Sequence, residues 1–402
     1  MKACGVIVEY NPLHNGHVYH IQESKKISKA DCIIAVMSGS FLQRGEPAII
    51  DKFHRTKAAL QAGVDIVLEL PFMYAVQSSE LFAQGAVQTL NHIGASSICF
   101  GSESGSISHF ITSYTNLKEK EKEYEQALKS FLQQGLSFPV SSEKAKQKID
   151  ALNNDFDISK PNNILGFSYI RTILDQNLPI EPLTIKRINN DFHDTAISNP
   201  ISSATSIRKE LVKEKGLSQQ LLQSFPHSTE VQLLMYKENA GIWHTLEHYF
   251  PLLHYRVQTM SLDELAQIQG VNEGLEHRIK QTAKQATSMN DWINRIKTKR
   301  YTWTRIQRLF IHLLTNTTTE QMQALEEDVP YVRILGFSNM GQEYLHEIKK
   351  QMEVPLLTSI GRNPVGLLAA EEKATAAYYS VLSPDKARRL IKQEITGPVR
   401  MY

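Results

Sequence analysis

The first hundred residues alternate between short apolar runs and longer segments of mixed polarity. The apolar runs lie at residues 3–10, 31–40, 64–70 and 96–104, and the segments between them have the spacing of amphipathic helices. Short β-rich runs that alternate with such helices predict βαβ units and a parallel sheet. The unbroken apolar run at residues 33–37 is typical of a strand that is covered on both faces.

The pattern changes twice further along the chain. Residues 105–160 alternate charges along helix-like segments, which indicates a helical insertion, and "IEPLTIKRI" then predicts one more strand. Beyond about residue 236 the strand–helix alternation stops. We therefore predict an α/β fold with a Rossmann-like parallel-sheet domain at residues 1–235. A mostly helical domain at residues 236–402, with a small α/β unit near residues 330–352, is expected to follow.

Composition and charge narrow the class of protein. The 402 residues are 42% apolar, which is enough for a sizeable core, and the formal net charge is only +2. A chain with so little excess charge is not a general polyanion binder, so a nucleic-acid surface would have to be a local patch. The three cysteines lie in strand-like runs without a C-x-x-C pair, which indicates buried thiols and predicts neither a disulfide framework nor a metal site.

The chain carries no sequence signal for a membrane. No apolar stretch approaches the roughly 20 residues that a spanning helix needs. The apolar run after Lys2 is short and ends at Glu9, so it does not resemble a signal peptide. We expect a cytoplasmic protein without a membrane partner.

A histidine turn follows the first predicted strand. His14, Asn15, Gly16 and His17 lie between that strand and the next helix. Ligands of parallel sheets bind at the carboxyl ends of the strands, and a helix N-terminus there favours phosphate. Two imidazoles three positions apart can donate to one anion and stabilise charge in a transition state. The structural alternative is that His17 caps the helix and His14 is a surface loop residue.

A second polar turn precedes a later helix. Ser203, Thr205 and Ser206 come before that helix, and Arg208 is expected in its first turn. Hydroxyls and backbone N–H groups at a helix start, followed by an arginine, predict a second phosphate-facing site. The alternative is an ordinary Ser/Thr N-cap with a solvated Arg208.

Three further positions fit a nucleotide. Gly101 follows the fourth strand, where backbone can approach adenine or ribose, although it is equally an ordinary loop glycine. Asn162 and Asn163 offer amides to a base or ribose, or cap a helix. Arg187 lies near the carboxyl end of the last predicted strand, within reach of phosphate or adenine.

Together, the two turns carry a resemblance. The sequences His14-Asn15-Gly16-His17 and Ser203-Ala204-Thr205-Ser206-Ile207-Arg208 resemble the H-x-G-H and S-x-T-x-I-R turns of the nucleotidylyltransferase superfamily. The strings "GVIVEYNPLHNGHVYH", "MSGSFLQRGEPAI", "ISKPNNILGFSYI" and "KTKRYTWTRIQR" are similar to those of the bacterial tRNA(Met) cytidine acetate ligase family. The similarity covers nearly the full chain and is loosest past about residue 320.

This resemblance implies a two-step reaction. Acetate would attack the α-phosphate of ATP, and the wobble cytidine of elongator tRNA(Met) would then attack the acetyl-adenylate to give N4-acetylcytidine. It implies catalytic roles for His14, His17 and Arg208, and Mg²⁺ is expected with the triphosphate although no dedicated ligand set is visible. The implied ATP-binding residues are Ile7, Val8, Glu9, Tyr10, Asn11, Pro12, Leu13, His14, Asn15, Gly16, His17, His20, Gly101, Asn162, Arg187, Ile188, Ser203, Thr205 and Ser206.

One local stretch supports an RNA acceptor. Residues 295–308, "RIKTKRYTWTRIQR", contain six basic residues, two interleaved aromatics and no acidic residue. Cations that contact phosphates beside aromatics that stack on unpaired bases are typical of RNA-loop binding. The expected RNA-binding residues are Lys297, Lys299, Arg300, Tyr301, Trp303, Arg305 and Arg308. The alternative is a helix with Trp303 in the core and solvated charges.

Other functions stay open at this stage. A small-molecule nucleotidylyltransferase, or a protein-directed acetate ligase of the citrate lyase-activating type, would use the same adenylation chemistry. An RNA-binding protein with a vestigial nucleotide site is the non-enzymatic alternative. The sequence assigns neither the acetate pocket nor the oligomeric state.

Overall fold

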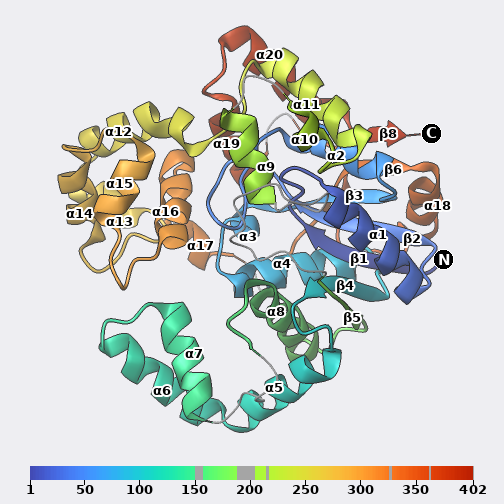
Figure 1. The fold of residues 1–402 in the computed structure, drawn as a ribbon, viewed down its shortest axis with the longest axis horizontal. Coiled ribbons are helices and arrows are strands. Elements are labelled where there is room, and N and C mark those ends of the chain that lie inside the picture. The colour runs from blue at the N-terminus through green and yellow to red at the C-terminus, as the bar shows by residue number, and fades with distance from the viewer. Residues whose placement is uncertain (150–156, 188–203, 214–216, 326–327, 362–363, 402) are drawn as a thin grey trace.

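An eight-stranded sheet forms the centre of the protein (Figure 1). The structure is a computed structural model that describes residues 1–149, 157–187, 204–213, 217–325, 328–361 and 364–401. The strand order is β5-β4-β1-β2-β3-β6-β7, and β8 pairs with β6. The strands are β1 (Ala3–Val8), β2 (Cys32–Ser38), β3 (Ile66–Leu70), β4 (Ser97–Ser102), β5 (Glu181–Lys186), β6 (Val332–Ser338), β7 (Leu356–Leu357) and β8 (Val399–Met401).

The first five strands form the expected parallel sheet. β1 lies between β2 and β4, and its register with β2 runs from the Ala3–Cys32 pair to the Val8–Met37 pair. All of β2 is buried, as its unbroken apolar sequence predicted. Because the strands are parallel, the loops after β1, β2, β4 and β5 leave the sheet at the same edge. The histidine turn follows β1 at this edge.

Helices cover both faces of the sheet. The buried side chains of α1 and α2 pack with one set of strand residues, and those of α4, α8 and α18 pack with the other set. These helices are α1 (Asn15–Ser28), α2 (Lys52–Gln61), α3 (Phe72–Ala75), α4 (Ser79–His92), α8 (Pro161–Asp175) and α18 (Asn339–Ile348). α1 buries only one face, whereas α2 and α3 are buried along most of their length.

Two groups of helices lie outside this layered core (Figure 1). The helical insertion consists of α5 (Ile107–Glu119), α6 (Glu121–Gln133) and α7 (Phe138–Lys148). The helical subdomain, which we define as α12 to α16, has its own core around the fully buried Trp292. Its helices are α12 (Phe250–Thr259), α13 (Leu262–Gln267), α14 (Leu275–Ala283), α15 (Met289–Ile296) and α16 (Trp303–Thr315).

The remaining helices connect these parts. They are α9 (Ala204–Lys213), α10 (Gln219–Leu222), α11 (His227–Ala240), the 3-10 turn η1 (Leu246–Tyr249), α17 (Thr319–Gln323), α19 (Leu367–Tyr379), α20 (Pro384–Ile391) and α21 (Gln393–Thr396). α11 packs on α2, so the chain passes over the sheet before it enters the helical subdomain. In the part of the chain that the structure describes, no helix is both long and apolar enough to span a membrane.

The C-terminal part of the chain returns to the sheet. The small α/β unit expected near residues 330–352 is formed by β6 and α18, and β6 pairs with β3 in antiparallel register. The sheet therefore contains strands from both predicted domains, which sequence patterns alone did not indicate. The chain ends with β8 beside β6.

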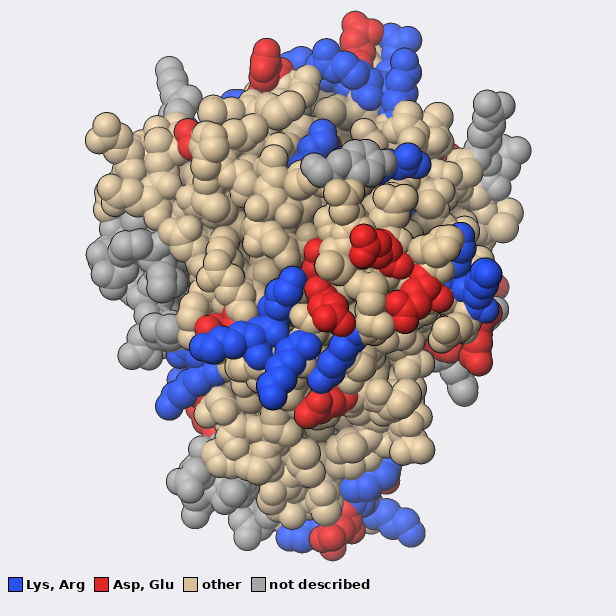
Figure 2. All heavy atoms as spheres, turned by 90° about the vertical axis from the view of Figure 1, so that its right-hand side faces the viewer, with Lys and Arg blue, Asp and Glu red and all other residues tan. Residues whose placement is uncertain are grey.

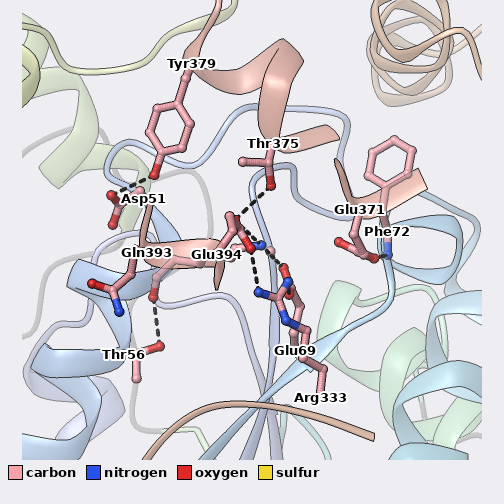
Figure 3. A network of polar contacts seen from close by, with 12 residues as sticks. Asp51, Thr56, Glu69, Phe72, Arg333, Glu371, Thr375, Tyr379, Gln393 and Glu394 are labelled. Carbon is pink, nitrogen blue, oxygen red and sulfur yellow. Dashed lines mark hydrogen bonds and ion pairs between the residues drawn. The ribbon is translucent and has the colours of Figure 1, made fainter. Parts of the chain in front are cut away.

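A buried network of ion pairs holds the C-terminal part of the chain against the sheet (Figure 3). Lys52 contacts Glu69 at 2.6 Å and Glu394 at 2.8 Å, and Arg333 pairs with the same two carboxylates. All four side chains are at most 2% exposed, and two cations balance two anions. Buried charges are tolerated only when they are paired in this way. The network joins α2, β3, β6 and α21.

Candidate active site

The loop after β1 is held tightly at the carboxyl edge of the sheet. Tyr10 is buried and has a left-handed φ of 46°. The Glu9 carboxylate accepts a hydrogen bond of 2.9 Å from the Gln43 backbone N–H in the loop after β2. Burial raises the pKa of Glu9, and the nearby Arg44 and Arg208 oppose that rise. The loops after β1 and β2 are therefore joined to each other at the carboxyl edge of the sheet.

The two histidines of the turn cap α1 together. The Nδ1 atom of His14 accepts from the Gly16 N–H at 3.1 Å, and the Nδ1 atom of His17 accepts from the His14 N–H at 3.2 Å. The rings stack with their centroids 3.7 Å apart. Because each Nδ1 is an acceptor, each neutral ring carries its proton on Nε2. Capping and ligand binding are thus compatible, and the cap residue is His14 rather than His17.

The histidine rings stay neutral at physiological pH. Burial lowers the pKa of His14 to about 3, and the cationic Arg187 and Arg208 contribute to the shift. Burial and the neighbouring His14 keep the pKa of His17 well below its usual range. Burial lowers the pKa of His20 to about 4. His14 and His17 therefore act as neutral N–H donors.

Arg208 brings the later turn to the first loop. Its Nη1 atom donates to the Asn11 carbonyl at 3.0 Å, and its Nη2 atom lies 3.3 Å from the Glu46 carboxylate. Thr205 and Ser206 lie within α9, not in a turn before it, so the sequence placed the helix start too late. Ser203 and Ile188, two expected ATP contacts, lie outside the described residues.

Arg187 and Asn162 form a third group at the same edge. The Arg187 guanidinium donates to the Asn162 side-chain oxygen at 3.4 Å, and the Asn162 amide donates to Glu103 at 2.7 Å. A Cβ atom at Gly101 would lie 3.5 Å from the Arg187 Cγ atom, so this glycine is next to the arginine. The three expected positions are therefore neighbours.

Asn163 and Glu103 hold the Arg187–Asn162 pair in place. The buried Asn163 side-chain oxygen accepts from the backbone N–H groups of Glu103 and Ser104 at 3.1 and 3.2 Å. The Glu103 carboxylate in turn accepts from the Asn163 N–H at 2.9 Å at the start of α8. Asn163 is thus a structural residue. Glu103 was not among the predicted site residues, although an acidic residue directly after a strand is a signal that the sequence contains.

Several expected ATP contacts are buried or contact other parts of the protein. Val8, Pro12 and Leu13 are buried and Ile7 is partly buried. The Asn15 side chain donates to the Gln223 carbonyl at 2.7 Å and so anchors α1 to the segment after α10.

Three polar atoms around the same loop stand out. The Tyr10 hydroxyl, the Asn11 Nδ2 and the His20 Nε2 are buried without a hydrogen-bond partner among the described residues. Buried polar groups are normally satisfied. A polar ligand at the carboxyl edge of the sheet would supply partners for such atoms.

The basic segment after α15 is only partly open. Lys297 and Lys299 are exposed. Arg300 pairs with Glu273, and Arg308 donates to the Gln77 carbonyl. Trp303 is partly buried against the core of the helical subdomain. Arg300 and Arg308 are thus engaged within the protein, which neither the RNA-binding prediction nor its alternative of solvated charges anticipated.

Tyr301 and Arg305 belong to the same segment. Tyr301 is only 9% exposed, and the guanidinium of Arg305 lies 4.9 Å from its ring centroid. Arg305 also donates to the Asn272 side chain at 2.7 Å. A base would stack on Tyr301 only after Arg305 moves. Arg300 and Arg305 line an open cleft of about 430 Å³ between the helical subdomain and the helical insertion.

The opposite side of the protein has mixed charge. Figure 2 shows the face that carries the N-terminus, where acidic side chains lie directly beside a cluster of basic ones. Ion pairs such as Lys26–Glu23 and that between the Met1 amino group and Glu347 lie on this side. Such a surface does not favour a polyanion.

Comparison with known proteins identifies the family. The chain matches the family described as HIGH Nucleotidyl Transferase over residues 1–394. It is 53% identical over 399 residues to the tRNA(Met) cytidine acetate ligase of Oceanobacillus iheyensis, covering 99% of this chain and 100% of the relative. The protein of the same name from a Geobacillus species is 46% identical over 400 residues, covering 99% of each chain.

Solved structures show the same fold. The apo crystal structure of Thermotoga maritima TmcAL superposes with a TM-score of 0.90 at 32% identity, and each chain is covered completely. The crystal structure of that protein bound to alpha-thio ATP has a TM-score of 0.88 at 34% identity, again over all of both chains. In sequence and in fold, this chain belongs to the tRNA(Met) cytidine acetate ligase family of HIGH nucleotidyl transferases.

Proposed function

We propose that this protein is an ATP-dependent acetate ligase that acetylates the wobble cytidine of elongator tRNA(Met). The observation that carries the proposal is the convergence of Arg208 on the loop that bears His14 and His17. Both motifs face one edge of the sheet, where a triphosphate suits their donors. The relatives named above support the acceptor.

The first step activates acetate. An acetate oxygen attacks the α-phosphorus of ATP, the bond to the β-phosphate breaks, and pyrophosphate leaves with the bonding electrons. The neutral His14 and His17 donate from Nε2 to the α- and β-phosphate oxygens, where negative charge develops. Arg208 holds the β- and γ-phosphates, and Arg187 with Asn162 holds the adenosine end.

The second step transfers the acetyl group. The exocyclic amine of cytidine attacks the acyl carbon of acetyl-adenylate, the bond to the AMP oxygen breaks, and the amine loses one proton. AMP is a good leaving group, which free acetate lacks. Positioning of the two reactants accounts for much of the rate in such a transfer.

RNA binding falls to the part after residue 236. Lys297 and Lys299 are exposed, and they belong to the same segment as Arg300 and Arg305, which line the cleft beside the helical insertion. Exposed cations beside a cleft suit the phosphates of an RNA loop. A cytoplasmic location, where tRNA and ATP meet, is part of this proposal.

Mg²⁺ remains a prediction about the substrate complex. In the described residues, no group of three or more His, Cys, Asp and Glu side chains is placed to hold a metal ion. An ion that accompanies ATP would therefore be held mainly by phosphate oxygens and water.

One experiment tests the activity directly. The protein is incubated with ATP, labelled acetate and total bacterial tRNA, and the labelled nucleoside is identified after digestion. We expect N4-acetylcytidine in elongator tRNA(Met), with one AMP and one pyrophosphate released for each acetyl group. Label in protein, or in a small molecule only, would instead support the protein-directed or small-molecule alternatives.

A further inference from the structure

We propose that Glu46 is a positioning residue that orients Arg208 for ATP and links it to α16 of the helical subdomain. The inference rests on the proposed function, because it concerns the same ATP site. Glu46 lies in the loop after β2, and its two carboxylate oxygens have different partners. The Oε2 atom lies 3.3 Å from Arg208, and the Oε1 atom accepts from the Gln307 side chain at 3.4 Å.

The contact with Arg208 fixes a flexible side chain. An arginine has several rotatable bonds, and a planar guanidinium binds phosphate only in the right orientation. The Asn11 carbonyl accepts from one nitrogen of Arg208 and Glu46 pairs with the other. Together these contacts set the plane of the guanidinium beside the histidine turn before ATP arrives.

The loop that carries Glu46 is itself seated on α16. Gly45 has a φ of 77°, and a Cβ atom there would lie 2.2 Å from the Arg308 backbone nitrogen. Only glycine permits so close an approach. On its other side, the same loop donates a hydrogen bond from the Gln43 N–H to the Glu9 carboxylate. It therefore touches the ATP loop and the helical subdomain at once.

This geometry connects the two halves of the reaction. α16 carries Arg305 and Arg308, and the exposed Lys297 and Lys299 directly precede it. A shift of α16 on RNA binding moves Gln307, Glu46 and then Arg208. The Glu46 carboxylate also lies beside a site for an anion, so its charge opposes ATP binding while it improves alignment.

Replacement of the charge separates these two effects. We expect Glu46→Gln to tighten ATP binding about three- to tenfold, because a negative charge leaves the site. The same variant should lose about tenfold in kcat of acetate-dependent ATP–pyrophosphate exchange, because Arg208 is less well oriented. ATP affinity is measured by calorimetry without acetate, and the exchange rate is measured without RNA.

A second variant tests the link to α16. Gln307→Met has a similar volume and removes the hydrogen bond to Glu46 while it keeps the charge. In the wild type, we expect tRNA(Met) to change the KM for ATP in the exchange reaction, and in Gln307→Met this change should disappear. Glu80→Gln is the matched control for Glu46→Gln, since Glu80 pairs with a different arginine, Arg171, at the same 3.3 Å.

The outcomes separate the inference from the proposed function. If the wild type shows no acetate-dependent exchange, the proposed function fails, while ATP calorimetry still reports on Glu46. If the wild type is active and Glu46→Gln matches it in both ATP affinity and kcat, the positioning role is wrong. A wild type whose KM for ATP ignores tRNA(Met) overturns the link to α16.

Discussion

The imidazole of His17 stacks on that of His14 with 3.7 Å between their centroids, and burial keeps both rings neutral. Each ring uses Nδ1 for the helix cap and presents Nε2–H to a ligand. One pair of side chains thus ends the loop, starts the helix and, in the function that we propose, supplies donors for phosphate.

Loss of one donor should slow adenylation. We expect His17→Ala to reduce acetate-dependent pyrophosphate release about a hundredfold or more, the usual effect of removing a transition-state donor. His14→Asn is an informative companion, because asparagine is a good N-cap but lacks the Nε2–H. It should keep the melting temperature and lose activity. Full activity in His17→Ala would remove the catalytic role.

Acid should destabilise the fold through its buried histidines. The pKa values of His14, His244 and His312 are lowered to about 3 by burial, whereas an unfolded histidine titrates near 6.5. Below pH 6.5 the unfolded state binds protons that the folded state refuses. Each histidine then lowers the free energy of unfolding by about 1.4 kcal/mol for every pH unit, until the pH reaches the pKa of the folded state. Urea unfolding at pH 7.5, 6.5 and 5.5 measures this loss, and a flat profile would contradict it.

Glu371 should have the opposite pH dependence. Burial raises the pKa of this carboxyl to about 8, and the neighbouring Glu69 adds to the shift. The protonated carboxyl stabilises the fold fully below the unfolded pKa near 4.5, and this stabilisation is lost as the pH rises toward 8. We expect Glu371→Gln to gain stability relative to the wild type as pH rises from 5 to 8, by about 1.4 kcal/mol per pH unit. Glu372→Gln, at an exposed neighbour, should show no such trend.

Breaking the buried network of ion pairs should lower the free energy of unfolding. Arg333→Met leaves Glu69 and Glu394 with one cation between them, which we expect to cost about 3–5 kcal/mol in the free energy of unfolding. Arg171→Met removes partly exposed pairs with Glu80 and Asp175 and should cost about 1 kcal/mol or less. Equal losses in urea titrations of the two variants would show that burial does not set the cost.

The exposed lysines should affect RNA and spare adenylation. We expect the double variant Lys297→Ala/Lys299→Ala to keep acetate-dependent pyrophosphate exchange and to bind tRNA(Met) more weakly. The slope of log affinity against log salt should fall by about 2. Lys349→Ala/Lys350→Ala changes two exposed lysines directly after α18, and this control should leave the slope unchanged. Wild-type RNA affinity in the first variant would place the RNA elsewhere.

The sequence predicted the part of the fold that local patterns encode. Strand and helix periods gave the five parallel strands, and the placement of His14 and His17 after the first of them indicated the site. Arg208 was identified by its motif, although only the folded chain brings it to Asn11. The ring tautomers and Glu46 could not be predicted, because they depend on contacts between distant loops.

The pairing of β6 with β3 was missed for a physical reason. β6 pairs with β3, which is far away in the sequence, through backbone groups. Every residue has these groups, so the local sequence carries no sign of the pairing. A weaker signal was present, since Glu69 and Arg333 are each the lone charge in an otherwise apolar strand. Such charges need buried partners of opposite sign. The two residues face each other in the β3–β6 register.

Glu394 completes the charge balance from near the end of the 402-residue chain. During translation, Lys52 and Glu69 leave the ribosome long before this carboxylate is made, and chains generally fold from the N-terminus onward. A nascent chain that stops before Glu394 leaves Lys52 and Arg333 to share the single carboxylate of Glu69. We expect such a chain to be destabilised and open to proteolysis, so that it does not persist as a shortened enzyme.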